Sequence, residues 1–127
     1  MMKPEDISYF ESGKIENIKF WKRLGAKPNF KNKKVLDFGC GHGSLALEIA
    51  NLGAQKVIGI DLNIDLINFA KNNLNQNFPN LKDRVEFEMI DLLKTDKFQD
   101  IDYIVTKDTF EHTLNLDQIL EKFYQIL

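Results

Sequence analysis

Little in the sequence points to an extracellular, disulfide-bonded or disordered protein. The 127 residues contain one cysteine, Cys40, which excludes an internal disulfide framework and any metal site built from several cysteines. Only three prolines occur and 43% of the residues are hydrophobic, so the chain can bury a core. The length predicts a single domain, and the lone cysteine fits a reducing compartment such as the cytoplasm.

Excess basic charge and long apolar runs are also missing. Seventeen Lys and Arg residues against nineteen Asp and Glu residues give a formal charge of −2, which argues against binding nucleic acid through its phosphates. No stretch approaches the roughly 20 apolar residues that span a membrane. The first residues lack the apolar run of a signal peptide. We therefore expect a cytoplasmic protein without a nucleic-acid or membrane partner.

Short apolar runs alternate with stretches of helical periodicity along most of the chain. An amphipathic helix is expected over residues 5–24, with Gly25 at its end. We divide the chain into an N-terminal helical segment, residues 1–32, which can form a lid, and a domain of residues 33–127. Within that domain we expect strands at 35–38, 56–61, 84–90 and 101–106, and helices at 45–52, 64–74 and 116–127.

This alternation of strand and helix determines the expected fold class. Strand, helix and strand in succession form βαβ units with parallel strands and right-handed crossovers. The sequence therefore predicts a doubly wound α/β fold around a mostly parallel sheet. Ligands of such sheets bind at the carboxyl ends of the strands, so the residues that follow the strands are the candidates for a site.

A glycine-rich turn follows the first expected strand. Gly39, Gly41 and Gly43 stand at alternate positions, and Asp37, at the strand end, lies two residues before the first of them. Glycine allows a tight turn and a close approach of the backbone to a ligand. Asp61 ends the next expected strand, where a carboxylate can accept hydrogen bonds from both hydroxyls of a ribose. Together these features predict a nucleoside ligand.

Two details indicate which nucleoside this is. The dinucleotide fingerprint places its third glycine three positions after the second, but Ser44 stands there and Gly43 comes one position earlier. The Asp37 carboxylate would repel a pyrophosphate and attract a cation. S-adenosylmethionine, which carries an ammonium and a sulfonium, fits this charge, whereas an NAD-dependent oxidoreductase domain is the less suitable alternative.

Residues 35–43 resemble the first signature motif of the class I S-adenosylmethionine-dependent methyltransferases, a Rossmann-like family. They are most similar to the small-molecule group related to ubiquinone-biosynthesis methyltransferases. The likeness continues to about His112, because residues 57–61, 85–92 and 101–105 are similar to the family's next three strands. The resemblance implies a partial sheet of strand order 3-2-1-4, with the remaining C-terminal strands absent, and we expect a truncated sequence.

The resemblance also implies roles for individual residues. Asp37 and the backbone of residues 39–43 would hold the methionine end, Asp61 the ribose, and Leu62 would pack on the adenine. Asp91 would accept from the adenine amino group, and the Leu92 amide would face the ring edge. The expected cofactor-binding residues are Asp37, Phe38, Gly39, Cys40, Gly41, Gly43, Asp61, Leu62, Asp91, Leu92 and Lys107, the last through its backbone beside the methionine portion.

Several of these residues have a structural interpretation that stays open. Asp61 can cap the helix that follows, and Asp91 can be an ordinary turn aspartate. Cys40 is expected to be inert, and His42 to face solvent or to make a local hydrogen bond. His112, in a Glu-His pair that resembles one common in this group, is either a general base on an acceptor hydroxyl or a residue that holds its loop.

Aromatic residues before the first strand are open to a similar choice. Tyr9 and Phe10 can form a lid over the cofactor and the acceptor, or they can pack in the core. For Trp21, packing is the interpretation that the helical spacing favours.

Two functional hypotheses therefore remain beside the oxidoreductase. The first is a methyltransferase that moves a methyl group to a small-molecule acceptor and leaves S-adenosylhomocysteine. The second is a non-catalytic cofactor-binding half-domain that docks a partner, or a second copy of itself. It would dock through the edge of the fourth strand, which is apolar at four positions: Ile101, Tyr103, Ile104 and Val105.

Overall fold

A four-stranded parallel sheet forms the centre of the computed structural model, which describes residues 2–107 and 115–127. The strands are β1 (Lys34–Phe38), β2 (Lys56–Asp61), β3 (Val85–Met89) and β4 (Tyr103–Val105), in the order β3-β2-β1-β4. All three strand pairs are parallel. The predicted fold class and strand order are thus confirmed, and β1 lies between β2 and β4.

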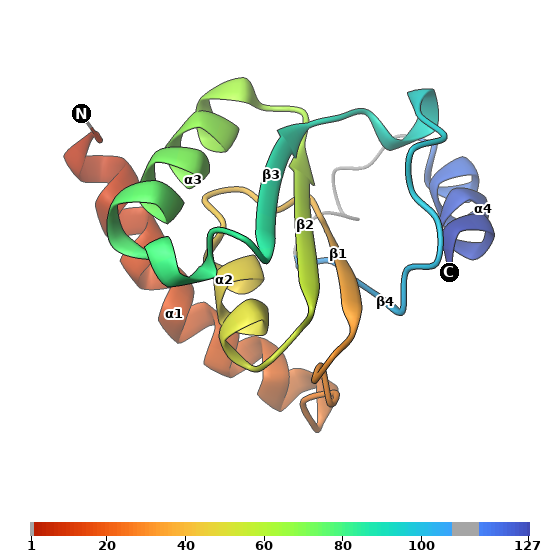
Figure 1. Cartoon of the computed structure of the whole chain (residues 1–127), viewed down its shortest axis with the longest axis horizontal. Helices are drawn as coiled ribbons and strands as arrows, with labels where there is room; N and C mark the ends of the chain where they lie inside the picture. The colour runs from red at the N-terminus through yellow and green to blue at the C-terminus, as the bar shows by residue number, and fades with distance from the viewer. Residues whose placement is uncertain (1, 108–114) are drawn as a thin grey trace.

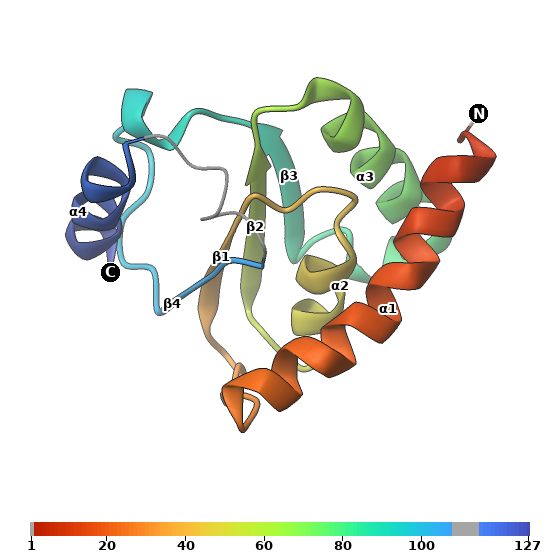
Figure 2. The same ribbon diagram turned by 180° about the vertical axis from the view of Figure 1, so that it is seen from behind.

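Helices cover both faces of the sheet (Figures 1 and 2). One face carries α1 (Pro4–Leu24), α2 (Ser44–Asn51) and α3 (Ile64–Asn77), and the opposite face carries α4 (Leu116–Ile126). Two short 3₁₀ helices, η1 (Pro79–Leu81) and η2 (Leu92–Lys94), flank β3. Among the described helices none is both long and apolar enough to cross a membrane.

The alternation of side chains along the strands divides the core into two clusters. Val35, Val57 and Val85 belong to the cluster beneath α1, α2 and α3. Leu36 and Ile58, each one position further along its strand, belong to the cluster beneath α4. Since Asp37 is two positions after Val35, its side chain is directed to the same face as α1.

Local signals explain where the helices begin and end. Pro4 opens α1, two acidic residues lie in its first turn, and Gly25 ends it in the left-handed conformation at φ 84°. Asn63 caps α3 because its side chain accepts hydrogen bonds from the Asp65 and Leu66 amides. Asn63 is therefore the N-cap of α3.

The buried face of α1 combines aromatic and polar residues. Phe10, Asn17 and Trp21 are buried, whereas Ile15 and Ile18 are 60% and 55% exposed. Trp21 donates its indole N–H to Glu48 Oε2 of α2 at 2.7 Å, which fixes the rotation of α1 about its axis. Trp21 is thus a packing residue, whereas Ile15 and Ile18 lie on the outer surface of α1.

The contact of Trp21 with α2 predicts unequal effects for two substitutions in α1. Trp21→Phe should lower the free energy of unfolding by about 1–3 kcal/mol, because it leaves a small cavity and removes the donor from Glu48. Ile18→Ala, on the exposed side, should change it by less than about 0.5 kcal/mol. Urea denaturation followed by circular dichroism measures both, and equal losses would contradict this orientation of α1.

Candidate functional site

The glycine-rich turn between β1 and α2 is held against the end of β2. Gly39, Gly41 and Gly43 have φ values of 77°, 55° and 91°, a region that side-chain-bearing residues rarely adopt. The amides of Gly39 and Cys40 both donate to the Ile60 carbonyl at 2.9 Å. The turn therefore has a fixed position above the carboxyl ends of the two central strands.

Asp61 fixes the same turn from the other side. Its Oδ2 accepts a hydrogen bond from the Gly41 amide, and its Oδ1 accepts one from the Asn63 amide, both at 3.0 Å. Because the cap of α3 is the side chain of Asn63, the capping interpretation of Asp61 is wrong. Each carboxylate oxygen retains a second lone pair that can accept a further hydrogen bond.

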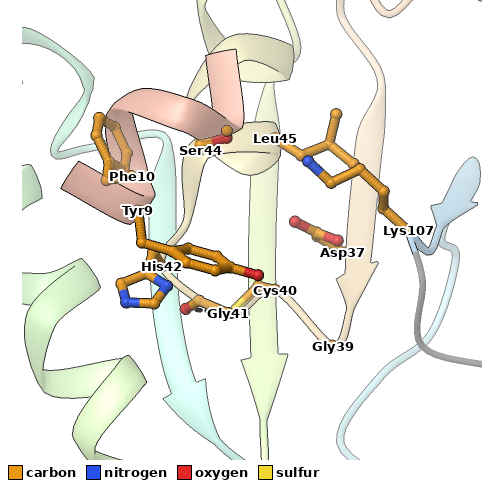
Figure 3. A pocket seen from close by; sticks show the side chains of 11 residues that line it. Tyr9, Phe10, Asp37, Gly39, Cys40, Gly41, His42, Ser44, Leu45 and Lys107 are labelled. Carbon is orange, nitrogen blue, oxygen red and sulfur yellow. Dashed lines mark hydrogen bonds between the residues drawn. The ribbon is translucent and has the colours of Figure 1, made fainter. Parts of the chain in front are cut away.

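A cavity of about 220 Å³ lies between the glycine turn and α1 (Figure 3). Typical pockets for whole ligands are larger, about 300–1,000 Å³, so this cavity has the size of a part of a ligand. Its wall consists of residues from α1, the end of β1, the glycine turn, α2 and the end of β4. They are Tyr9, Phe10, Gly13, Asp37, Gly39, Cys40, Gly41, His42, Ser44, Leu45 and Lys107.

Several predicted site residues lie outside this cavity. Leu62 is 70% exposed beside Asp61, whereas Leu92 is buried in the core beneath α4. The ring of Phe38 packs against Phe123, with ring centres 5.3 Å apart. Asp91 caps η2, because its Oδ1 accepts a hydrogen bond from the Leu93 amide at 3.1 Å, and it therefore has the structural role of a turn aspartate.

Gly43 also lies outside the cavity, and its contact is with β3. A Cβ at this position would come within 2.7 Å of the Phe87 ring, and a Cβ at Gly59 of β2 would come within 2.8 Å of the same ring. By contrast, a Cβ at Gly41 would meet no atom within 4 Å. The turn is therefore closely packed at Gly43 and open at Gly41.

Asp37 is the most unusual residue of the cavity wall. Its side chain is buried, and Oδ2 has no hydrogen-bond partner among the residues that the structure describes. Burial raises the pKa of Asp37 to about 7, against the attraction of Lys107 and with a smaller contribution from Asp61. An unpartnered, buried carboxylate oxygen beside a cavity is an acceptor for a cationic or hydrogen-bond-donating ligand.

The side chain of Lys107 reaches this cavity from the loop after β4 (Figure 3). Its Nζ donates to Asn17 Oδ1 at 2.7 Å, and Asn17 Nδ2 donates to Ser44 Oγ at 3.2 Å. Gly13 allows this approach of α1, because a Cβ there would overlap the Ser44 side chain. From the sequence we expected a role for the backbone of Lys107 but none for its side chain or for Asn17. The signal that could have indicated Asn17 is its position as a polar residue between the buried aromatic residues of α1.

The turn also contains His42 and Cys40, whose side chains are enclosed by other residues of the protein. Of the two alternatives expected for His42, solvent exposure or a hydrogen bond, the structure shows a hydrogen bond, although its partner is distant in sequence. The His42 Nε2 lies 3.0 Å from Asp6 Oδ1 of α1, and the ring of Tyr9 packs against the imidazole. Burial raises the pKa of the Cys40 thiol well above its usual range, so this cysteine is not a nucleophile near neutral pH. Glu111 and His112 lie outside the described residues.

Comparison with known sequences identifies the family. The family pattern described as "Methyltransferase domain" matches residues 29–127. The chain belongs to this methyltransferase family. The glycine turn, Asp61 and Asp91 all lie within the matched range, whereas α1, which lines one side of the cavity, precedes it.

Individual relatives agree with this assignment. Phosphoethanolamine N-methyltransferase 3 of Arabidopsis thaliana is 33% identical over 121 residues, covering 94% of this chain and 23% of the relative. Ribosomal protein L11 methyltransferase of Shewanella woodyi is 51% identical over 49 residues, 39% of this chain and 17% of the relative. The chain thus spans less than a quarter of either curated relative.

The fold comparison leads to the same family. A crystal structure from Listeria monocytogenes, described as an S-adenosylmethionine-dependent methyltransferase, superimposes with a TM-score of 0.70 and 28% identity. The match covers 84% of this chain and 48% of the other. The predicted cofactor class, S-adenosylmethionine, is thereby confirmed for the methyltransferase family to which the chain belongs.

The different surroundings of two glycines predict different costs for the same substitution. Gly43→Ala should lower the free energy of unfolding by about 2–4 kcal/mol, because the new Cβ meets Phe87 in a left-handed backbone. Gly41→Ala has only the backbone cost, about 1 kcal/mol. Chemical denaturation of both variants tests this order, and a greater loss at Gly41 would overturn it.

The raised pKa of Asp37 predicts a pH-dependent stability. Because its pKa is about 7 in the folded protein against 3.8 ordinarily, the folded state holds this proton more tightly than the unfolded state. Stability should therefore fall as pH rises, by roughly 2 kcal/mol between pH 5 and pH 8. The Asp37→Asn variant should lose much less, and parallel pH profiles of the two proteins would contradict this account.

Proposed function

We propose that this chain binds S-adenosylmethionine at the glycine turn and forms part of an enzyme that methylates a small molecule. The observation that carries the proposal is the buried Asp37 carboxylate, with an unpartnered oxygen, in the wall of a cavity beside the open glycine turn. A cation is the most suitable partner for that oxygen, and the amino-acid end of S-adenosylmethionine supplies an ammonium next to a sulfonium.

The same charge disfavours a dinucleotide cofactor. A pyrophosphate at this turn would lie near two carboxylates, Asp37 and Asp61, of which Asp37 is buried away from screening by solvent. The oxidoreductase alternative therefore has no support in the electrostatics of the site.

The size of the cavity suggests which part of the cofactor it takes. A volume of about 220 Å³ suits the amino-acid end, and the nucleoside would then lie outside it, over the end of β2. There Asp61 has lone pairs for the two ribose hydroxyls, and the exposed Leu62 offers an apolar surface for a base. Asp91 and the Leu92 amide, at the end of β3, are the residues we assign to the adenine edge.

The contribution of this chain to the reaction is to hold and orient the cofactor. When bound, S-adenosylmethionine supplies an electrophilic methyl group on its sulfonium, and correct positioning of an acceptor accounts for much of the rate of such a transfer. Asp37 and the turn orient the amino-acid end. His112 remains our prediction for a base that takes the proton from an acceptor hydroxyl.

We also assign residues 1–32 to a lid over the site. Tyr9 and Phe10 of α1 line the cavity, and Tyr9 is 68% exposed while its ring packs on His42 of the turn, with ring centres 4.7 Å apart. Phe10, in contrast, is buried against Phe69 and Phe78 and holds the helix in place. Tyr9 is therefore the better candidate for a residue that contacts the cofactor or the acceptor.

The class of acceptor is proposed from the relatives. The relative matched over 94% of this chain is a phosphoethanolamine N-methyltransferase, whereas the match to the ribosomal protein L11 methyltransferase covers 39% of it. The longer match favours a small-molecule acceptor. The net charge of −2 gives no support for nucleic acid.

A second candidate function is a cofactor-binding module without activity of its own. The observation that favours it is the outer edge of β4, which pairs with β1 on one side and with no other strand of the described residues. Such an edge can dock a partner or a second copy of the chain. A methyl-transfer assay with labelled S-adenosylmethionine and amine or hydroxyl acceptors separates the two, because the module binds the cofactor without consuming it.

Isothermal titration with S-adenosylhomocysteine tests the proposed site, with NADH as the negative control. The wild-type protein should bind the first ligand only. Asp61→Asn should weaken this binding about tenfold to a hundredfold, because a charge-assisted hydrogen bond to the ribose is lost. Asp83→Asn, at an exposed aspartate before β3, should leave the affinity unchanged. Unchanged affinity in the Asp61 variant would exclude its role with ribose.

A further inference from the structure

The end of α1 and the loop that leads to β1 form a basic end of the molecule. Residues 18–36 contain seven of the seventeen Lys and Arg residues and none of the nineteen Asp and Glu residues. In both ribbon views this segment lies at the amino ends of the strands, at the opposite end of the sheet from the glycine turn (Figures 1 and 2). The formal charge of −2 for the whole chain therefore conceals a local excess of positive charge.

Most of these positive charges have no acidic partner. Within the described part of the chain, five exposed basic side chains form no ion pair or hydrogen bond: Lys22, Arg23, Lys27, Lys31 and Lys33. The first two lie in the last turn of α1 and complement the helix dipole. The three loop lysines lie beyond the helix, so their mutual repulsion has no such compensation.

Two acidic side chains at the same end of the sheet are bound to other groups. Asp102, just before β4, accepts the Lys34 amide at 2.8 Å, and Glu86 of β3 pairs with Lys56 of β2 at 2.8 Å. Neither of them pairs with the loop lysines. The exposed basic groups are therefore available to an anionic partner from outside the chain.

The outer face of α1 adds exposed aliphatic side chains to this basic surface. Ile15 and Ile18 are 60% and 55% exposed, and Leu24, at the end of the helix, is 59% exposed. Their spacing of three and four residues places Ile15, Ile18 and Lys22 on one face of the helix, with Lys19 beside them. A helix face that combines aliphatic and basic residues is typical of helices that lie in the interface of a bilayer.

The composition of this surface distinguishes between kinds of anionic partner. Single-stranded nucleic acid stacks its bases on aromatic faces, but Trp21 and Phe30 of this segment are buried and Phe20 is half-buried. Protein interfaces depend mainly on Trp, Tyr and Arg, and Arg23 is the one arginine among the seven basic residues. Lysines beside aliphatic side chains instead match the phosphates and acyl chains of an anionic bilayer.

We propose that the outer face of α1 and residues 25–33 form a surface that binds reversibly to an anionic lipid bilayer. The lysines would lie against the headgroup phosphates, and the exposed aliphatic side chains would enter the boundary between headgroups and acyl chains. The glycine turn, at the opposite end of the strands, would stay accessible (Figure 1).

This inference does not depend on the proposed function, because no residue of the surface lines the cavity. It replaces the expectation that the chain has no membrane partner. That expectation was drawn from the net charge and from the lack of a long apolar run, and neither of these tests a local surface.

Vesicle flotation measures the binding, with vesicles of phosphatidylcholine alone and vesicles that also contain phosphatidylglycerol. Each Lys or Arg near an anionic surface strengthens binding by a factor of about five. The wild-type chain should therefore partition into the anionic vesicles about a hundredfold more strongly than into the neutral ones. High salt should remove most of this preference, because it screens the charges.

A triple variant tests the loop lysines. The chain with Lys27→Gln, Lys31→Gln and Lys33→Gln should partition into anionic vesicles about a hundredfold less than wild type. A control variant changes three exposed lysines of other elements, has the same net charge and should partition as wild type does. Its substitutions are Lys71→Gln, Lys82→Gln and Lys94→Gln.

A double variant tests the aliphatic face. Ile15→Ser with Ile18→Ser should weaken partitioning about tenfold, because less apolar surface enters the bilayer. The matched control is Leu116→Ser with Leu120→Ser, at residues of α4 that are 36% and 45% exposed, and it should leave partitioning unchanged. All these positions are at the surface, and circular dichroism melts establish that each variant is folded.

Each result either supports the proposal or overturns it. Equal partitioning into both kinds of vesicle, or equal losses in the two triple variants, would overturn it. An unchanged double variant would overturn the entry of α1 into the bilayer. Binding of single-stranded RNA without partitioning into anionic vesicles would overturn the proposal in favour of nucleic acid. Titration of the same variants with S-adenosylhomocysteine should match wild type, so either proposal can fail without the other.

Discussion

A carboxylate without a full set of hydrogen bonds lies at the end of the central strand, and much of the molecule is arranged around it. Asp37 points to the face of the sheet that α1 covers, so it is removed from solvent, and its pKa rises to about 7. A buried acid of this kind destabilises the folded protein when it is ionised. Under the proposed function, the positive charge of the cofactor would compensate for that cost.

The residues around Asp37 are held by contacts between distant parts of the chain. The glycine turn is fixed by Ile60 and Asp61 from β2, and α1 is fixed on α2 by Trp21 and Glu48. Because these contacts are made by the protein's own groups, the backbone of the proposed site would need little further ordering to bind a ligand. Through these contacts α1, which precedes the range that matches the family, is held where its residues line the cavity.

The sequence predicted the sheet well because its signals are local. Short apolar runs bounded by Gly and Asp marked β1, β2 and β3, while β4 is shorter than expected: the Ile101 amide bonds to Ile126 of α4 instead of to the sheet. The turn and the ends of the strands were likewise found from spacing alone. The exposed side of α1 and the contact between Asn17 and Lys107 were not, because both depend on how α1 is rotated against α2, which no local pattern determines.

The ring of Phe87 lies against two glycines from different elements, Gly43 of the turn and Gly59 of β2. Neither glycine can acquire a side chain while that ring stays in place, and a smaller residue at position 87 would leave a void beneath both. A substitution at any one of these three positions should therefore lower stability. A side chain at either glycine would need a smaller residue at position 87 to make room for it. In the divergence of such a chain, these residues are expected to change together or not at all, although none of them touches the cavity.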